Sequence, residues 1–296
     1  MMKQTGSQYE LFQEACYGSF VALRYSSIVH PNMHSMLQSN RNVSHSVDYE
    51  TFVKSMDLLE EINCRTLTGA QLGAGECVEN DSDTNAAFLT FDDGWVSDVD
   101  CVLPVLAERN LKATFFIPSG LIGKTGRLSW RHVTALSQMG MEIGSHTVSH
   151  AKLTGLVSGK LTAELLASRN QIEDALGQPV SSLAVPMGYY DQRVIEHAWA
   201  SGYTTVFTSD WGINVCRPGE SLFKRCAIRR KHRVRDVRAL LSRNPLLQMT
   251  RETLFQVGGR LQQRTHVFER KQDGLLALPQ WLSDRISGSR KGKKQD

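Results

Sequence analysis

The sequence predicts an α/β protein built on a parallel β-sheet. Short apolar runs with the length and bounding residues of buried strands recur along the chain, and segments with helical apolar spacing lie between them. The connections are short, and this β-α-β order implies right-handed crossovers between parallel strands. About six or seven such units over roughly 200 residues fit either a (β/α) barrel or a doubly wound sheet.

The first half of the predicted units lies between residues 17 and 118. In order, we expect a strand at 17–29, an amphipathic helix at 46–63, a polar loop at 73–85, a buried strand at 86–91, a helix at 99–110 and a buried strand at 112–118. The strand at 86–91 (AAFLTF) is apolar throughout and runs directly into two adjacent aspartates.

The alternation continues in the second half. In order, we expect a helix at 129–140, a strand at 141–146, a helix at 163–177, a strand at 182–188, a helix at 192–202 and a strand at 203–209. Gly140 and Gly177 are placed to close the first two of these helices. Residues 237–249 and 252–270 show apolar repeats with basic faces, which predict further helices.

Length and composition indicate a globular chain. With 296 residues, 41% of them hydrophobic and 22% charged, it can bury a core without disulfide staples. The six cysteines include no C-x-x-C pair and are expected to be free thiols. No apolar run approaches the ~20 residues of a transmembrane helix, and residues 1–20 lack the apolar core of a signal peptide. We therefore expect a cytoplasmic protein, free or peripheral to the inner face of a membrane.

Charge is distributed unevenly along the chain. Residues 217–296 carry 20 Lys and Arg against 7 Asp and Glu, whereas the first 216 residues are acidic overall. A basic C-terminal third suggests an anionic partner, such as a membrane surface or a lipid-phosphate-linked glycan, and a solvated basic face is the alternative. Charge alone also fits nucleic acid, but no nucleic-acid-binding motif is present, so no nucleic-acid partner is expected.

Several reactive side chains fall where predicted strands end. Asp92 and Asp93 follow the strand at 86–91, His146 and His150 follow the strand at 141–146, and Pro186 follows the next strand. In parallel α/β folds these strand ends share one face, where sites collect. One carboxylate with two imidazoles suits Zn²⁺ and leaves a coordination position open for water. The other aspartate is then placed to take a proton from that water, and a cation would relieve the repulsion between the two acids.

Three segments resemble the NodB-homology polysaccharide deacetylases, carbohydrate esterase family 4. They are LTFDDGW (89–95), LSWRHVTALSQMGMEIGSHTVSH (128–150) and AVPMGYYD (184–191), and the resemblance extends over roughly residues 20–232. It implies a distorted (β/α) barrel and metal-dependent removal of acetyl groups from a glycan. It also implies the following roles: Asp93, His146 and His150 as ligands of Zn²⁺ or a similar ion, Asp92 as the base, the Met187 N–H as the oxyanion donor, and Pro186, Tyr189 and Trp211 as substrate contacts. For Trp211 the alternative is an indole packed in a turn.

The chain also departs from the family pattern. Many members have an arginine where this chain has Ala184, and exopolysaccharide-linked members often have Tyr-His where this chain has Tyr25-Ser26. The Leu-x-His motif that supplies the general acid in many members is missing, and His232 is the candidate in its place. The histidines without motif context, His45 among them, are expected to be structural or surface residues.

Together these features predict a deacetylase of N-acetylated sugars in a polysaccharide, an oligosaccharide or a lipid-linked precursor, with a role in surface or exopolysaccharide biosynthesis. The alternatives are another C–N hydrolase for a small amide or imide, and a catalytically impaired glycan-binding relative. The expected organisation is an N-terminal segment at 1–19, the catalytic domain at 20–235, a helical basic extension at 236–286 and a disordered basic tail at 287–296.

Overall fold

A computed structural model describes residues 19–30, 45–74, 76, 85–215 and 219–242. A nearly closed, barrel-like sheet forms the centre of this part, which confirms the predicted α/β barrel. Neighbouring strands follow the order β10 (Asn214–Val215), β1 (Ser19–Tyr25), β5 (Asn85–Asp92), β6 (Thr114–Ile117), β7 (Glu142–Ser145), β8 (Ser182–Ala184), β9 (Thr205–Phe207) and β11 (Leu222–Phe223). From β1 through β11 these pairs are parallel, as the short crossovers predict.

Two further strands pair with the middle of this series. β12 (Cys226–Ala227) lies parallel to β1, and β4 (Cys64–Leu67) lies parallel to β5. Because only two residues separate β11 from β12, the chain links the β9 side of the sheet back to β1 and nearly closes the barrel. A separate parallel pair joins β2 (Ser27–Val29) to β3 (Ser46–Asp48).

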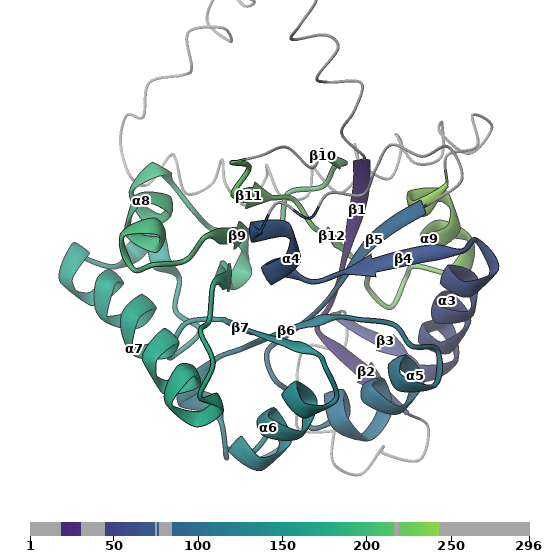
Figure 1. Cartoon of the computed structure of the whole chain (residues 1–296), viewed down its shortest axis with the longest axis horizontal. Helices are drawn as coiled ribbons and strands as arrows, with labels where there is room; N and C mark the ends of the chain where they lie inside the picture. The colour runs from purple at the N-terminus through teal and green to yellow at the C-terminus, as the bar shows by residue number, and fades with distance from the viewer. Residues whose placement is uncertain (1–18, 31–44, 75, 77–84, 216–218, 243–296) are drawn as a thin grey trace, which may run out of the picture. The chain divides into compact units, whose positions relative to one another are not determined.

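Helices surround the sheet (Figure 1). They are α3 (Tyr49–Glu61), α5 (Leu103–Glu108), α6 (Trp130–Gln138), α7 (Ser158–Leu176), α8 (Gln192–Ala200) and α9 (Val234–Leu241). Side chains cap the starts of three of them, since Asp48, Ser129 and Asp191 accept N–H groups from the first turns of α3, α6 and α8. Gly177 ends α7 in the left-handed conformation, as the sequence predicts.

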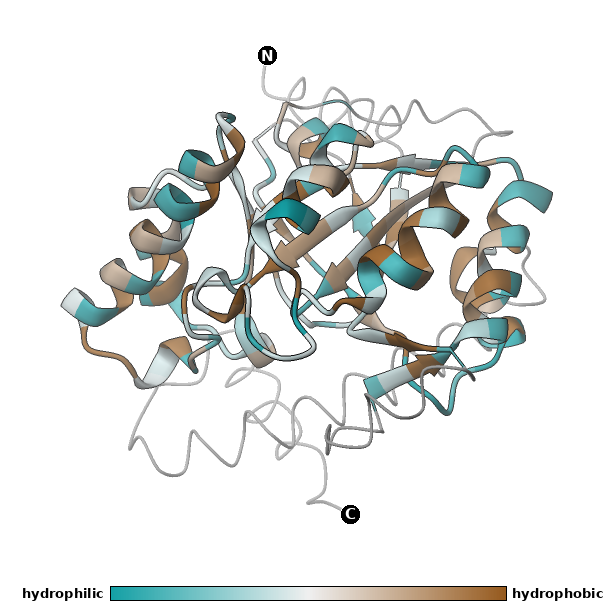
Figure 2. Cartoon of the chain, turned by 90° about the horizontal axis from the view of Figure 1, so that it is seen from below, coloured by the Kyte–Doolittle hydropathy of each residue, from teal (hydrophilic) through white to brown (hydrophobic). Residues whose placement is uncertain are grey.

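Apolar side chains fill two spaces. A large core lies between the sheet and the helices, whose apolar faces turn inward in Figure 2. A smaller cluster fills the barrel interior, and its members are Phe20, Ala22, Leu67, Leu72, Ala86, Phe88, Phe116, Ala184, Phe207 and Phe223. The interior aromatic rings are in contact, with centroids 4.6 Å apart for Phe88 and Phe207. The barrel is therefore a packed core and not a pore.

Element boundaries differ from the sequence prediction in several places. The predicted strand at 17–29 is interrupted at Ser26 and becomes β1 and β2. Helix α7 begins five residues earlier than expected, at Ser158, and the helix at 99–110 opens with a π-turn at Asp98–Val102. The strand at 182–188 stops at Ala184 because Pro186 cannot donate to a ladder and starts a tight turn.

Short elements escaped the sequence analysis altogether. These are β4, β10, β11, β12 and α4 (Gly69–Gly73), which are too short to show a period. Cys64, Cys101 and Cys226 are buried, Cys226 is a free thiol as expected, and Cys16, Cys77 and Cys216 lie outside the described residues. So do the predicted helix at 252–270 and the tail at 287–296. In the described part of the chain, no helix combines the length and the hydropathy needed to cross a membrane.

Candidate metal centre and active site

Asp92 and Asp93 are adjacent but project into different surroundings. Asp92 ends β5 and is 1% exposed, inside the barrel. Asp93 leaves the strand with a φ of 76°, and Gly94 follows with a φ of 63°. These two left-handed residues turn the chain sharply. Arg127 donates a hydrogen bond to the Asp93 carbonyl and supports the turn, while its guanidinium lies 3.5 Å from the centre of the Trp95 ring.

His146 follows β7 directly and has a fixed ring orientation. It is 1% exposed, and its Nδ1 lies 2.7 Å from the Ala184 carbonyl oxygen, which accepts the Nδ1 proton. Nε2 is then the atom left to bind a ligand. Burial lowers the pKa of His146 to about 4. The ring is therefore neutral near pH 7, which is the form that binds a metal.

His150 ends a tight loop held by a helix. Its backbone N–H donates to the Thr147 hydroxyl, and Thr147 and His150 have φ values of 64° and 59°. Glu164 of α7 accepts the N–H groups of Val148 and Ser149 at 3.0 and 2.9 Å and also accepts the Ser149 hydroxyl. Because one carboxylate satisfies three donors, the loop has little freedom to move.

The structure brings Asp93, His146 and His150 to one point. One ligand atom from each residue lies within 4.8 Å of the other two. The three side chains could therefore hold a metal ion together. Asp93 Oδ1 is 3.2 Å from Nε2 of His150 and 3.8 Å from Nε2 of His146. Burial opposes ionisation of Asp93, but the hydrogen bond with His150 and the surrounding cationic groups outweigh it. They hold the pKa of its carboxyl well below the usual range.

Backbone strain is concentrated at this point. Six non-glycine residues in the described part of the chain have positive φ, and four of them lie at the cluster or beside it: Asp93, Thr147, His150 and Met187. Such conformations cost on the order of 1 kcal/mol or more each and persist where the surroundings impose them. Their concentration here supports a functional site on independent grounds.

Asp92 is held by a buried arginine that the sequence analysis did not identify. Arg225, between β11 and β12, is 0% exposed and binds both carboxylate oxygens of Asp92 at 2.6 and 3.0 Å. The same guanidinium donates to Thr90 Oγ1 and to the Thr208 carbonyl, which fixes its plane. Arg24 on β1 is a weaker neighbour, with Nη1 3.7 Å from Asp92 Oδ2. Asp92 is therefore oriented rigidly beside the cluster.

The turn at Pro186–Gly188 follows β8, next to His146. Met187 has a φ of 58° and is 50% exposed, so its side chain points out of the core. Tyr189 lies at the edge of the histidine loop, with Lys152 Nζ 5.0 Å from its ring centre. The turn thus begins two residues after the Ala184 carbonyl that binds His146, and the roles of Pro186, Met187 and Tyr189 stay predictions.

Trp211 and His232 contact each other, with ring centroids 5.7 Å apart. His232 is 7% exposed, and its Nδ1 accepts the Arg229 N–H at 2.9 Å, which leaves the neutral ring with its proton on Nε2. Burial, with help from the charge of Lys231, lowers the pKa of His232. The described contacts of His232 are with Trp211 and its own turn, outside the Asp93 cluster.

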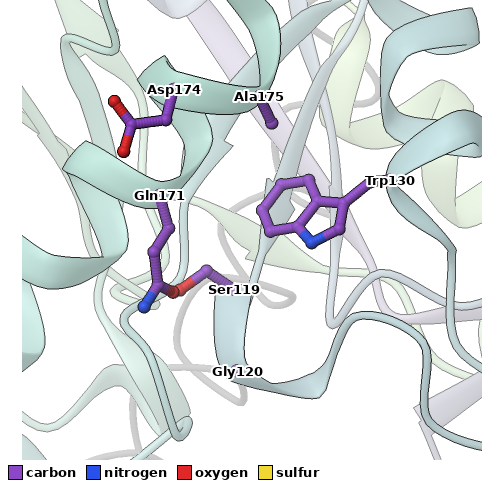
Figure 3. A pocket seen from close by; sticks show the side chains of 6 residues that line it. All are labelled: Ser119, Gly120, Trp130, Gln171, Asp174 and Ala175. Atoms are coloured by element: carbon purple, nitrogen blue, oxygen red, sulfur yellow. The ribbon is translucent and has the colours of Figure 1, made fainter.

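A separate cavity of about 530 Å³ lies between α6 and α7. Trp130, Gln171 and Asp174 line it together with Ser119, Gly120 and Ala175, and Figure 3 shows the indole facing the side chains from α7. None of the predicted site residues lines this cavity. Its lining residues Ser119 and Gly120 are linked to the histidine loop by backbone hydrogen bonds to the Thr147 and Val148 carbonyls.

The fold and the cluster together define an α/β-barrel protein with a candidate two-histidine, one-aspartate metal centre. The family model for polysaccharide deacetylase matches residues 79–206, a range that contains Asp92, Asp93, both histidines and the Pro186 turn. This segment is therefore similar to the polysaccharide deacetylase family. Trp211, Arg225 and His232 lie beyond the matched range.

Curated relatives are similar to part of this chain, and a solved structure shares its fold. YxkH of Bacillus subtilis is 26% identical over 179 residues, which cover 60% of this chain and 63% of the relative. Chitin deacetylase 1 of Cryptococcus neoformans is 31% identical over 147 residues, covering 45% of this chain and 30% of the relative. The match thus spans less than two thirds of either relative. The Streptococcus pyogenes deacetylase PplD, solved in complex with acetate, shares the fold with a TM-score of 0.65 at 21% identity, over 76% of this chain and 99% of that one.

Proposed function

We propose that this protein is a metal-dependent deacetylase that removes acetyl groups from the N-acetylated sugars of a polysaccharide, an oligosaccharide or a lipid-linked glycan precursor. The observation that carries the proposal is the cluster of Asp93, His146 and His150 with Asp92 fixed beside it. The family match and the chitin deacetylase relative support the reaction and the substrate class. A role in surface or exopolysaccharide biosynthesis is part of the proposal.

The donor set fits Zn²⁺. One carboxylate and two neutral imidazoles are ligands of a catalytic zinc site, and three protein ligands leave a position for water. The Ala184 carbonyl gives His146 the outer hydrogen bond that metal-binding histidines usually make. A bound zinc ion would supply a water of lowered pKa and would polarise a carbonyl group.

Asp92 acts as the base in this proposal. It takes a proton from the water, whose oxygen attacks the acetamide carbonyl carbon, and Arg225 holds the carboxylate in the orientation that this transfer needs. The Met187 N–H would donate to the developing oxyanion, an effect worth roughly 3–4 kcal/mol per donor. The C–N bond then breaks, and acetate and the free amine leave. His232 is the candidate acid for the amine, and this role requires its imidazolium form, because a neutral imidazole does not give up its Nε2 proton to an amine.

Substitution of the two aspartates tests the proposal. Asp93→Ala should lose bound metal and activity together, whereas Asp92→Asn should keep the metal and lose turnover by about 100-fold or more. Metal content is measured by elemental analysis, and acetate release is measured with N-acetylglucosamine oligomers. Asp100→Asn, an exposed carboxylate, is the matched control and should change neither quantity.

Two outcomes would contradict the proposal. Wild-type protein that purifies without bound metal would contradict the proposed metal centre. Acetate release that survives both substitutions would contradict the roles assigned to Asp92 and Asp93. A catalytically impaired glycan-binding protein would bind the oligomers and release no acetate. A hydrolase for small amides would release product from a small amide and leave the oligomers intact.

We further propose a cytoplasmic location, with the basic C-terminal region against an anionic membrane surface or a lipid-phosphate-linked glycan. The charge of residues 217–296 supports this partner. Cell fractionation at low and high salt checks it: protein that leaves the membrane fraction as salt rises agrees with a peripheral location, and periplasmic protein contradicts it.

A further inference from the structure

We propose that the barrel mouth beside Asp92 contains an anion-binding subsite formed by Arg24, Arg229 and His45, which takes a phosphate or carboxylate group of the glycan substrate. The inference deepens the proposed function and rests on it for the identity of the glycan. None of these three residues belongs to the motifs that indicate the metal centre. They are brought together by strand pairing alone.

The first step is the register of three neighbouring strands. Arg24 on β1 is paired with Thr90 on β5 and with Ala227 on β12. The Ile228 N–H donates to the Arg24 carbonyl at 2.9 Å, so the β12 ladder continues past its last paired residue. Since side chains alternate along a strand, Arg229 falls on the same side as Ala227 and Arg24. That side is the barrel interior, where Asp92 meets Arg225.

The second step is the position of Arg229 along the barrel. Tyr25 is paired with Phe91, so the next residue, Ser26, lies level with Asp92. Continuation of the β12 register places Arg229 level with Ser26 on the other side. Arg229 and Asp92 thus flank the same small residue across two strand spacings, or roughly 10 Å. A serine between them leaves room that a larger side chain would fill.

His45 borders the same space. It directly precedes β3, whose first residue, Ser46, is paired with Ser27. Burial is the main cause that lowers the pKa of His45. The positive charges of Arg229 and Arg24 lower it further, and the negative charge of Asp93 opposes them. All three charged groups therefore lie within electrostatic range of the imidazole. The histidine that lacks any motif in the sequence sits at the edge of the candidate active site.

The third step is the charge balance. Arg225 is matched by Asp92 through two hydrogen bonds. Arg24 hydrogen-bonds Ser209 and approaches Asp92 only at 3.7 Å. The Nε atom of Arg229 is buried and has no hydrogen-bond partner within the described residues. In the same part of the chain, the Arg229 side chain forms no ion pair. A buried donor without an acceptor is costly, and a guanidinium fork matches the oxygens of phosphate or carboxylate. An anionic group on the substrate would supply the missing acceptor.

The experiment compares charged and neutral forms of one sugar on the metal-loaded, full-length protein. Dissociation constants are measured by calorimetry for N-acetylglucosamine and N-acetylglucosamine 1-phosphate, and in a second arm for a disaccharide of N-acetylglucosamine and glucuronic acid. The wild type should bind one charged ligand about 10- to 100-fold more tightly than the neutral one, which is the effect of a charge-assisted hydrogen bond. The arm that shows the preference distinguishes phosphate from carboxylate.

Arg229→Gln should abolish most of that preference, and Arg229→Lys should keep part of it. Arg230→Gln is the matched control, because Arg230 is exposed and its charge acts on Asp48. A wild type without preference for either anion, or a preference that survives Arg229→Gln, would overturn the inference. Direct binding of phosphate to the metal would raise the affinity of every variant alike. Failure of acetate release with an intact Arg229-dependent preference would contradict the proposed function alone.

Discussion

The pairing of Asp92 with Arg225 is the interaction at residue scale on which the candidate site most depends. Both groups are buried, and the contact joins residues 133 positions apart in the sequence. Loss of one partner of a buried pair leaves the other charge without compensation, which costs about 3–5 kcal/mol. The pair is therefore worth testing with a substitution that keeps the charge.

Arg225→Lys should leave the protein folded and metal-bound but lower kcat for acetate release by about 100-fold. A lysine keeps the charge but cannot bind both oxygens of Asp92, so the base loses its fixed orientation. Steady-state kinetics and metal analysis measure the two effects. Arg238→Lys, at an exposed pair with Glu61, is the control and should behave as wild type. Equal kcat values for the two variants would show that Arg225 has no positioning role.

Asp98 is a second buried acid near the site, and it has a different role in stability. It is 0% exposed, and neither carboxylate oxygen makes a hydrogen bond within the described residues. Burial raises the pKa of Asp98 well above its usual value, and the negative charge of Asp93 adds to this effect. Because the pKa of Asp98 is higher in the folded state, the free energy of unfolding falls as pH rises above about 3.9, the pKa of an aspartate in the unfolded chain.

Asp98→Asn should therefore stabilise the protein more at pH 7 than at pH 4. The difference should exceed about 1 kcal/mol, the equivalent of one unit of pKa. Urea unfolding at both pH values measures it. Asp100→Asn on the same π-turn is exposed and should show no such pH-dependent gain. An equal gain at both pH values would mean that Asp98 is not protonated in the folded protein.

At the scale of elements, the histidine loop depends on a glycine in another connection. Gly120 follows β6 and donates to the Val148 carbonyl at 2.9 Å. A Cβ at this position would lie 2.8 Å from both that oxygen and Val148 Cγ1. A side chain cannot be accommodated there unless the loop moves, and the loop connects the two histidines that are the predicted ligands.

Gly120→Ala should weaken metal binding by about tenfold or more, the effect of disturbing groups that orient metal ligands. Competition with a chelator measures the metal dissociation constant. Gly159→Ala in α7 provides the control, since among the described residues no atom outside its own helical turn and its chain neighbours lies within 4 Å of the added Cβ. Unchanged metal affinity in Gly120→Ala would show that the loop tolerates the displacement.

At the scale of the whole barrel, the interior is divided along its axis. Phenylalanines occupy one part, and the aromatic cluster of Phe88, Phe116, Phe207 and Phe223 is its centre. Arginine and aspartate occupy the part next to the strand ends, where the guanidinium of Arg225 lies 5.2 Å from the Phe116 ring. The apolar part supplies packing free energy, and the polar part carries the site.

Phe207→Ala should lower the free energy of unfolding by about 3–5 kcal/mol, because it opens a cavity among rings that cannot collapse into it. Denaturant titration measures the loss. Trp199→Ala removes a larger ring that is 43% exposed, and it should cost about 0.5 kcal/mol or less. A similar cost for both variants would mean that the barrel interior is loosely packed.

The sequence alone predicts the order of the longer strands and helices and the three residues of the candidate metal centre. Local signals suffice for these features, since buried strands are apolar runs, helices have a 3.6-residue period, and Asp93, His146 and His150 belong to recognisable motifs that directly follow strands. The structure brings these three residues together. The break at Ser26 and the strands of two to four residues carry no such signal, because they are stabilised by neighbours and not by their own pattern.

The surroundings of the cluster follow from the tertiary structure. Arg225 reaches Asp92 from 133 residues further along the sequence, and Glu164 fixes the histidine loop from a neighbouring helix. No spacing rule links these residues to the motifs, since their approach depends on the register of β1, β5 and β12 and on the near closure of the barrel. The predicted ligands belong to short sequence motifs, whereas Arg225 and Glu164, which orient Asp92 and the histidine loop, reach them only through long-range pairing and helix packing.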